Sequence, residues 1–83
     1  MIGLLHVLQY PSPTAPRLHS QRIEYTEPPR RGRRFEMRPR SGQPWKTASV
    51  ELDPQLVGDG AVWFKTAYTA YLLEPLPELE PEL

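Results

Sequence analysis

The chain has 83 residues, with ten basic and ten acidic side chains and no formal net charge. This length supports a single domain with a small core. Because cysteine is absent, disulfides, zinc–thiolate sites and cysteine nucleophiles are excluded.

The charges are unevenly distributed. Residues 17–46 carry nine basic and three acidic side chains, a net charge of +6, whereas residues 51–83 carry one basic and seven acidic side chains, a net charge of −6. Such asymmetry indicates an anionic partner or charge pairing within the molecule. The lack of cysteine fits a cytosolic protein. The lack of asparagine, beside abundant arginine, glutamate and proline, is one mark of heat-adapted proteins.

Residues 1–10 (MIGLLHVLQY) form an almost continuous apolar run. We expect a strand buried on both faces, because a helix of this length without an N-cap is weak. The alternative is a helix with an apolar stripe of Met1, Leu4, Leu5 and Leu8. The run stops before Pro11, far short of the ~20 residues of a membrane-spanning helix, and it lacks the basic start and cleavage site of a signal peptide.

Residues 11–20 contain three prolines and predict a connector. Residues 21–40 then predict a β-hairpin, because apolar and polar side chains alternate on both sides of a basic loop. The inward-facing side chains of the two strands would be Ile23, Tyr25, Phe35 and Met37.

The hairpin loop is predicted at residues 27–33 (EPPRRGR), where two prolines cannot donate to a ladder and Gly32 accepts a positive φ. We expect a register that pairs Glu24 with Arg34, because the alternative pairing of Glu24 with Glu36 sets like charges opposite each other. The same register pairs Arg22 with Glu36 and Ile23 with Phe35. Four arginines then lie at the tip: Arg30, Arg31, Arg33 and Arg34.

Pro39 is expected to end the hairpin. Residues 45–53 (WKTASVELD) alternate again and predict a half-buried strand. Its buried face would hold Ala48, Val50 and Leu52, and its polar face Trp45, Thr47, Ser49 and Glu51. Residues 53–60 predict a turn region with room for one helical turn, capped by Asp53 and started by Pro54.

Residues 61–73 (AVWFKTAYTAYLL) fit both a strand and a helix. Their aromatic and threonine content, after a glycine-rich lead-in, favours a strand, and its length predicts a bend or tight turn near residues 66–69. The helical alternative has a stripe of Phe64, Tyr68, Tyr71 and Leu72. Residues 74–83 (EPLPELEPEL) predict an acidic, proline-rich tail that forms no ladder.

These elements predict an all-β domain over residues 1–73, followed by a tail at residues 74–83. Four or five short antiparallel strands with proline and glycine turns are typical of a small barrel or sandwich, SH3-like or OB-like, here with proline-rich terminal arms.

No residue set indicates catalysis, a cofactor or a metal. His6 is expected to be a satisfied interior side chain, and His19 a solvated one. Two histidines without acidic neighbours make a poor metal set. No glycine-rich loop precedes a helix, so no phosphate cradle is indicated. We therefore predict a non-catalytic protein without a cofactor.

The arginine cluster predicts an anionic partner, because the planar guanidinium suits phosphate and stacks on aromatic rings. The candidate contacts are Arg30, Arg31, Arg33, Arg34, Arg38 and Arg40. The candidate stacking residues are Trp45 and Trp63, with Tyr68 and Tyr71 as further aromatics. The competing interpretations are a solvated basic loop and aromatic residues that only fill the core.

Binding of nucleic acid with little sequence specificity is the function predicted from these residues. The alternatives are a structural or accessory subunit of a larger assembly, such as a phage virion, a multiprotein complex or a homo-oligomer, and a small inhibitor of a larger enzyme. The expected location is the cytoplasm, or the virion for a structural subunit. The acidic tail residues could be solvated, fold back on the arginines or dock on another protein; they are Glu74, Glu78, Glu80 and Glu82.

Overall fold

The computed structural model describes residues 1–40, 42–58 and 60–77, and every regular element among them is a β-strand. The strands are β1 (Ile2–Leu8), β2 (Arg17–Glu24), β3 (Arg34–Pro39), β4 (Trp45–Ser49), β5 (Gln55–Val57), β6 (Ala61–Lys65) and β7 (Ala70–Leu76). They form one unclosed antiparallel sheet in the order β4-β3-β2-β1-β7-β6-β5. Among the described residues there is no helix long and apolar enough to cross a membrane.

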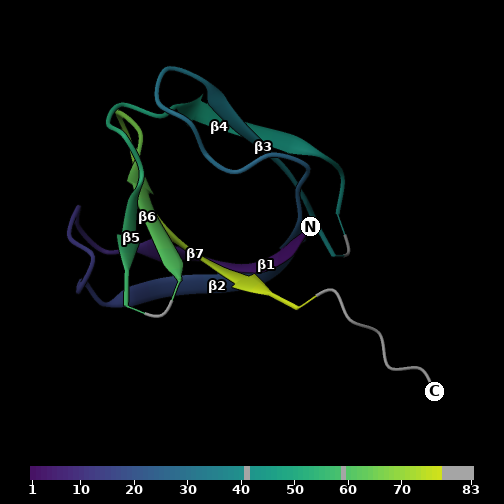
Figure 1. Cartoon of the computed structure of the whole chain (residues 1–83), viewed down its shortest axis with the longest axis horizontal. Coiled ribbons are helices and arrows are strands. Elements are labelled where there is room, and N and C mark those ends of the chain that lie inside the picture. The colour runs from purple at the N-terminus through teal and green to yellow at the C-terminus, as the bar shows by residue number, and fades with distance from the viewer. Residues whose placement is uncertain (41, 59, 78–83) are drawn as a thin grey trace.

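The sheet curls around its core. β3 and β4 lie across from the part formed by β1, β2 and β7, and β5 and β6 stand at one side (Figure 1). The all-β class is therefore confirmed. The predicted number of four or five strands is too low, because β5 lies in a segment that we expected to turn and because residues 61–76 supply two strands.

β1 confirms the strand predicted at the start of the chain. Its partners are β2 on one side and β7 on the other, so it lies inside the sheet. Side chains are buried on both of its faces, Leu5 on one and His6 and Leu8 on the other. β2 begins at Arg17, so the predicted connector of residues 11–20 is shorter than expected.

The predicted hairpin exists, but its register is wrong. β2 and β3 pair through Ile23↔Pro39 and Glu24↔Arg38, so Glu24 faces Arg38 where we expected Arg34. Opposite charges still face each other. The shift of four positions keeps the inward-facing set inward, because side chains alternate with a period of two. The connecting segment is therefore longer than predicted and starts at Tyr25, whose side chain is buried.

β4 departs from simple alternation. Its pairing with β3 shifts between Arg34↔Ser49 and Glu36↔Lys46, so β4 contains one extra residue, a β-bulge. Thr47 points inward, where its Oγ1 accepts a hydrogen bond from the N–H of Phe35 at 3.1 Å, and the extra residue after it places Val50 on the inner side as well. The predicted buried face of Ala48, Val50 and Leu52 is therefore wrong: Thr47 and Val50 are buried, Ala48 is half-buried, and Leu52 is exposed.

The C-terminal part forms a hairpin. β6 and β7 confirm strands over residues 61–73, and a tight turn at residues 66–69 separates them, with the Thr66 N–H donating to the carbonyl of Thr69 at 2.8 Å. The expected helical turn near Asp53 is wrong, since β5 follows as an edge strand.

β7 extends into the segment predicted to be a tail without a ladder, since Leu4↔Glu74, Gly3↔Pro75 and Ile2↔Leu76 pair. Beyond Leu73 the described ladder of β7 continues with β1 alone, and such edge positions tolerate a proline. Glu78, Glu80 and Glu82 lie outside the described residues.

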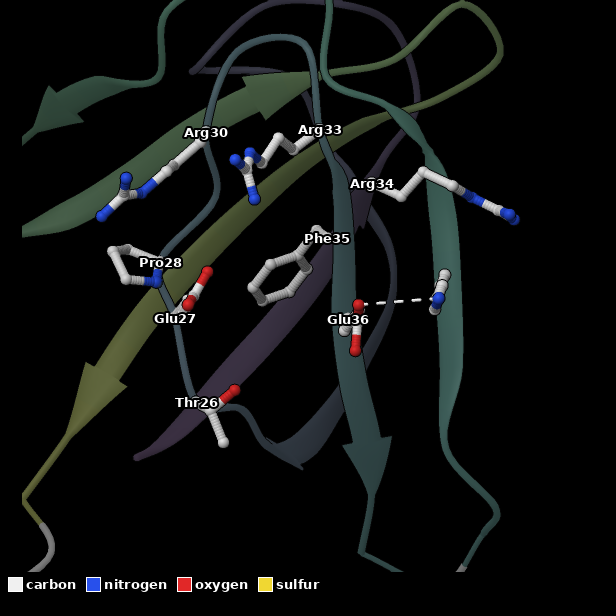
Figure 2. Close-up of a pocket in the computed structure, with 9 residues that line it drawn as sticks. Thr26, Glu27, Pro28, Arg30, Arg33, Arg34, Phe35 and Glu36 are labelled. Atoms are coloured by element: carbon white, nitrogen blue, oxygen red, sulfur yellow. Dashed lines mark ion pairs between the residues drawn. The ribbon is translucent and has the colours of Figure 1, made fainter.

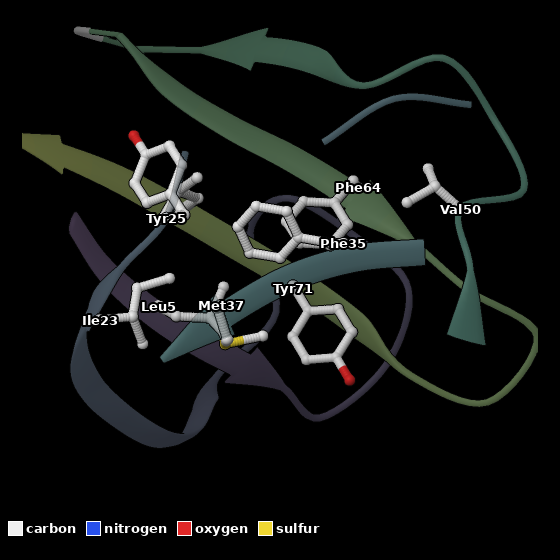
Figure 3. Packing of buried hydrophobic residues seen from close by; sticks show 9 residues of the cluster. Leu5, Ile23, Tyr25, Phe35, Met37, Val50, Phe64 and Tyr71 are labelled. Carbon is white, nitrogen blue, oxygen red and sulfur yellow. The ribbon is translucent and has the colours of Figure 1, made fainter. Parts of the chain in front are cut away.

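Two apolar clusters fill the two faces of the sheet. The larger lies inside the curl and contains Leu5, Ile23, Tyr25, Phe35, Met37, Val50, Phe64, Tyr71 and Leu73 (Figure 3). Its aromatic rings form a row, with centroids 5.7 Å apart for Tyr25 and Phe35, 5.3 Å for Phe35 and Phe64, and 5.1 Å for Phe64 and Tyr71. The smaller cluster contains Leu8, Ala15, Trp63, Ala70 and Leu72.

Candidate anion-binding surface

The tip of the basic loop is attached to the rest of the molecule at Val50. The N–H of Gly32 donates to the Val50 carbonyl at 2.8 Å, and the N–H of Val50 donates to the Arg33 carbonyl at 3.0 Å. A turn bond from the Arg33 N–H to the Arg30 carbonyl, 3.1 Å long, closes the tip. Gly32 has a φ of +82°, which a residue with a side chain rarely adopts. The backbone that carries the arginines is therefore fixed by hydrogen bonds.

The two sides of the predicted hairpin separate beyond Glu24 and leave a pocket between them. Pro28 and Pro29 have no N–H to donate, and Pro29 is buried. The pocket has a volume of about 500 Å³. We call it the arginine slot; it is lined by Thr26, Glu27, Pro28, Arg30, Arg33, Arg34, Phe35, Glu36 and Lys46.

The arginine slot combines an apolar floor with a cationic wall. Figure 2 shows the guanidinium of Arg33 beside the ring of Phe35, whereas the side chains of Arg30 and Arg34 extend away from that ring in opposite directions, Arg34 across β4. The Nε of Arg34 donates to the carbonyl of Thr47 at 2.8 Å, which fixes its direction. Arg33 thus directs its guanidinium group toward the pocket, and Arg30 contributes to its lining.

The positive charge in the slot exceeds the negative charge. Four cationic side chains and two carboxylates line it, and the Nζ of Lys46 lies 3.6 Å from the carboxylate of Glu36 across the β3–β4 ladder. Within residues 1–40, 42–58 and 60–77, no ion pair joins a carboxylate to any of the six predicted contact arginines. Within this part of the chain, no carboxylate in ion-pair contact neutralises these six charges.

The structure brings together some of the predicted contact residues. Arg30, Arg33 and Arg34 line the arginine slot, and Arg38 lines a second hollow beside it. Arg31 pairs with Val50 through its backbone, and Arg40 follows the far end of β3; neither lines these two pockets.

Three charged lining residues were missed by sequence reasoning: Glu27, Glu36 and Lys46. Lys46 could have been found only from its position opposite Glu36. That position cannot be inferred until the pairing of β3 with β4 is known.

The aromatic candidates divide by exposure. Trp45 is 38% exposed and lines the second hollow, whereas Trp63 is 6% exposed within the smaller cluster. Tyr71 is part of the core row, and Tyr68 lies on the β6–β7 turn with 87% exposure. Trp45 alone of these four adjoins the arginine slot.

A polar cluster on the other side of the sheet was not predicted. The buried His6 has its Nδ1 2.6 Å from the Oγ of Ser20 and its Nε2 3.0 Å from a carboxylate oxygen of Glu74. Arg17 lies 3.5 Å from the other oxygen. The hydrogen bond with His6 is the main cause that lowers the pKa of Glu74 below 4.5; the charges of His6 and Arg17 add to it, and burial opposes it. His19 is exposed.

The cluster has the residue types of a serine–histidine–carboxylate triad. Its connectivity is reversed, however, because the serine contacts Nδ1 and the carboxylate contacts Nε2. Ser20 and His6 are also direct cross-strand neighbours. These contacts satisfy both ring nitrogens of a buried side chain, as the stability of the fold requires.

Comparisons with protein-family models, with curated proteins and with solved structures found no match to this chain. The function is therefore argued from its own geometry.

Proposed function

We propose that the protein binds nucleic acid through phosphate contacts in the arginine slot, without catalysis. The observation that carries this proposal is Arg33, whose guanidinium lies beside Phe35 in a pocket that Arg30 also lines, while neither arginine makes a described ion pair. Unneutralised guanidinium groups gathered on a fixed backbone are suited to phosphate, which they bind with two parallel hydrogen bonds.

The fixed backbone supports binding more strongly than the charge alone. The tip of the basic loop is attached to Val50 at both Gly32 and Arg33, so its backbone keeps one conformation. Holding the arginines in place lowers the entropy lost on binding. The buried ring of Phe35 beneath them adds an apolar floor, near which a hydrogen bond to a phosphate is stronger than in open water.

Little sequence specificity is expected. Phosphate contacts fix the position of a protein on nucleic acid but carry no sequence information. The side chains that face the slot are mainly charged, and amides such as asparagine and glutamine, which read base edges in pairs of hydrogen bonds, do not line it.

A pair of charge-matched variants tests the proposal. Arg33→Gln removes a slot charge, and Arg22→Gln removes an exposed charge of β2 that lies outside the slot. We expect Arg33→Gln to weaken binding of labelled oligonucleotides about tenfold, as for a lost hydrogen bond to a charged group. Arg22→Gln should weaken it less than about twofold, because distant exposed charges are screened. Fluorescence anisotropy measures both, and equal losses would sink the proposal.

A second candidate function, as a subunit of an assembly, is favoured by the outer edge of β2. The described ladder between β2 and β3 covers Ile23 and Glu24, and Leu18, further along the same edge, is 64% exposed. An uncovered strand edge is a template for a strand from another chain. Mass measurement in solution tests this: a monomer at every accessible concentration would count against self-assembly through β2.

A further inference from the structure

A second hollow opens beside the arginine slot. It has a volume of about 420 Å³, within the ~300–1,000 Å³ range of pockets that hold small organic groups. Unlike the slot, it has a strong apolar contribution, from Ile2, Met37, Pro44 and Trp45. We call it the tryptophan groove.

The two hollows lie next to each other. Thr26, Glu36 and Lys46 line both of them. Glu36 and Lys46 are cross-strand neighbours on β3 and β4 and form an ion pair of 3.6 Å. A ligand can therefore reach from one hollow to the other past this pair.

Trp45 is positioned to receive a flat ring. It begins β4 and lies opposite the buried Met37 in the ladder, so its backbone is held by a strand. Its side chain remains 38% exposed and contributes to the wall of the groove. Arg38 lines the same groove and brings a second cation close to it.

We propose that the tryptophan groove stacks a base of single-stranded nucleic acid whose neighbouring phosphate occupies the arginine slot. This inference rests on the proposed function and narrows its ligand class. Exposed aromatic side chains stack on the unpaired bases of single strands in a way that tolerates any sequence. In a duplex the bases are stacked on one another, so Trp45 would have no free face to contact. The carboxylates of an acidic peptide would satisfy the slot, but they have no flat ring to stack on the tryptophan beside it.

Three probes separate the base from the phosphate. They are a single-stranded oligothymidine of about 10 nucleotides, chosen within the ~4–16 nucleotides that small β-domains cover, an abasic oligomer of the same length, and a duplex. We expect the wild type to bind the oligothymidine at least about tenfold more tightly than the abasic oligomer, as for one stacked base. Trp45→Ala should abolish this preference and leave abasic binding unchanged, while Trp45→Phe should retain most of it.

Tryptophan fluorescence gives an independent readout. The chain has two tryptophans, of which Trp63 is buried and Trp45 is exposed. Oligothymidine should quench the emission of the wild type and leave that of Trp45→Phe unchanged.

Different results would contradict the base subsite and the proposed phosphate binding. Equal, salt-dependent binding of the oligothymidine and the abasic oligomer would overturn the base subsite and leave phosphate binding standing. No binding of any probe would overturn both proposals. Tighter binding of the duplex, or displacement of oligothymidine by polyglutamate at equal charge, would also overturn the base subsite.

Discussion

Phe35 connects the arginine slot to the core, and its removal should disturb both. The side chain is 2% exposed. Its ring centroid lies 5.3 Å from that of Phe64 and 5.7 Å from that of Tyr25, so it links Tyr25 to the rest of the aromatic row. The same ring forms the floor of the slot (Figure 2).

The expected cost follows from this burial. A buried phenylalanine replaced by alanine typically costs ~3–5 kcal/mol. A chain of 83 residues has a total stability of about 4–12 kcal/mol, at ~0.05–0.15 kcal/mol per residue. Phe35→Ala should therefore remove about a quarter or more of the stability. Phe35→Leu keeps most of the volume but loses both ring contacts, and should cost ~1–3 kcal/mol.

Urea denaturation followed by tryptophan fluorescence measures these costs. Tyr68→Ala is the matched control, because it removes an aromatic ring that is 87% exposed and should change stability by less than about 0.5 kcal/mol. If Phe35→Leu had the same urea midpoint as the wild type and as the control Tyr68→Ala, the packing of the hairpin on the core would be refuted. This test remains valid if Phe35→Ala fails to fold.

Two further predictions concern the strands around β1. Gly3→Ala should destabilise the fold by ~1–3 kcal/mol, because a Cβ atom would lie 2.8 Å from Leu73 Cδ1 and 3.1 Å from the Glu74 carbonyl oxygen; an unchanged melting temperature would contradict this packing. Glu74→Gln should lower stability at neutral pH by less than ~1 kcal/mol, since the carboxylate is partly exposed. The lowered pKa of Glu74 stabilises the fold above pH 4.5, and this contribution is lost as the pH falls through the folded-state pKa. Urea midpoints of wild type and variant should therefore converge in acid, and a pH-independent difference would rule out the contact with His6.

The local features of the fold could be predicted from the sequence. The turn at residues 66–69 follows from a run too long for one strand, and the hairpin follows from the alternation around Ile23 and Phe35. The position of Gly32 at a positive φ was also predictable, because glycine adopts that conformation without a steric penalty.

The features that depend on distant residues could not be predicted. The register of β2 and β3 depends on the burial of Tyr25 and on the hydrogen bonds between the loop tip and Val50. The register predicted from the sequence rests on opposed charges alone, so it takes neither of these contacts into account. Thr47 is buried despite its polar character, because it accepts a hydrogen bond from Phe35, and the bulge in β4 lets Val50 point to the same side. The partner of His6 lies 68 residues away at Glu74, in a segment whose prolines argued against a strand.

The salt dependence of oligonucleotide binding tests the cationic slot most directly. Single-stranded binding has a slope of about −0.7 in log K against log salt for each phosphate neutralised. The slot has four cationic side chains and two carboxylates, so it can neutralise two to four phosphates, and we expect a slope between about −1.4 and −2.8. Arg33→Gln should make that slope shallower by about 0.7, and Arg22→Gln should leave it unchanged. A slope near zero for the wild type, or one that Arg33→Gln does not alter, would contradict phosphate binding in the arginine slot.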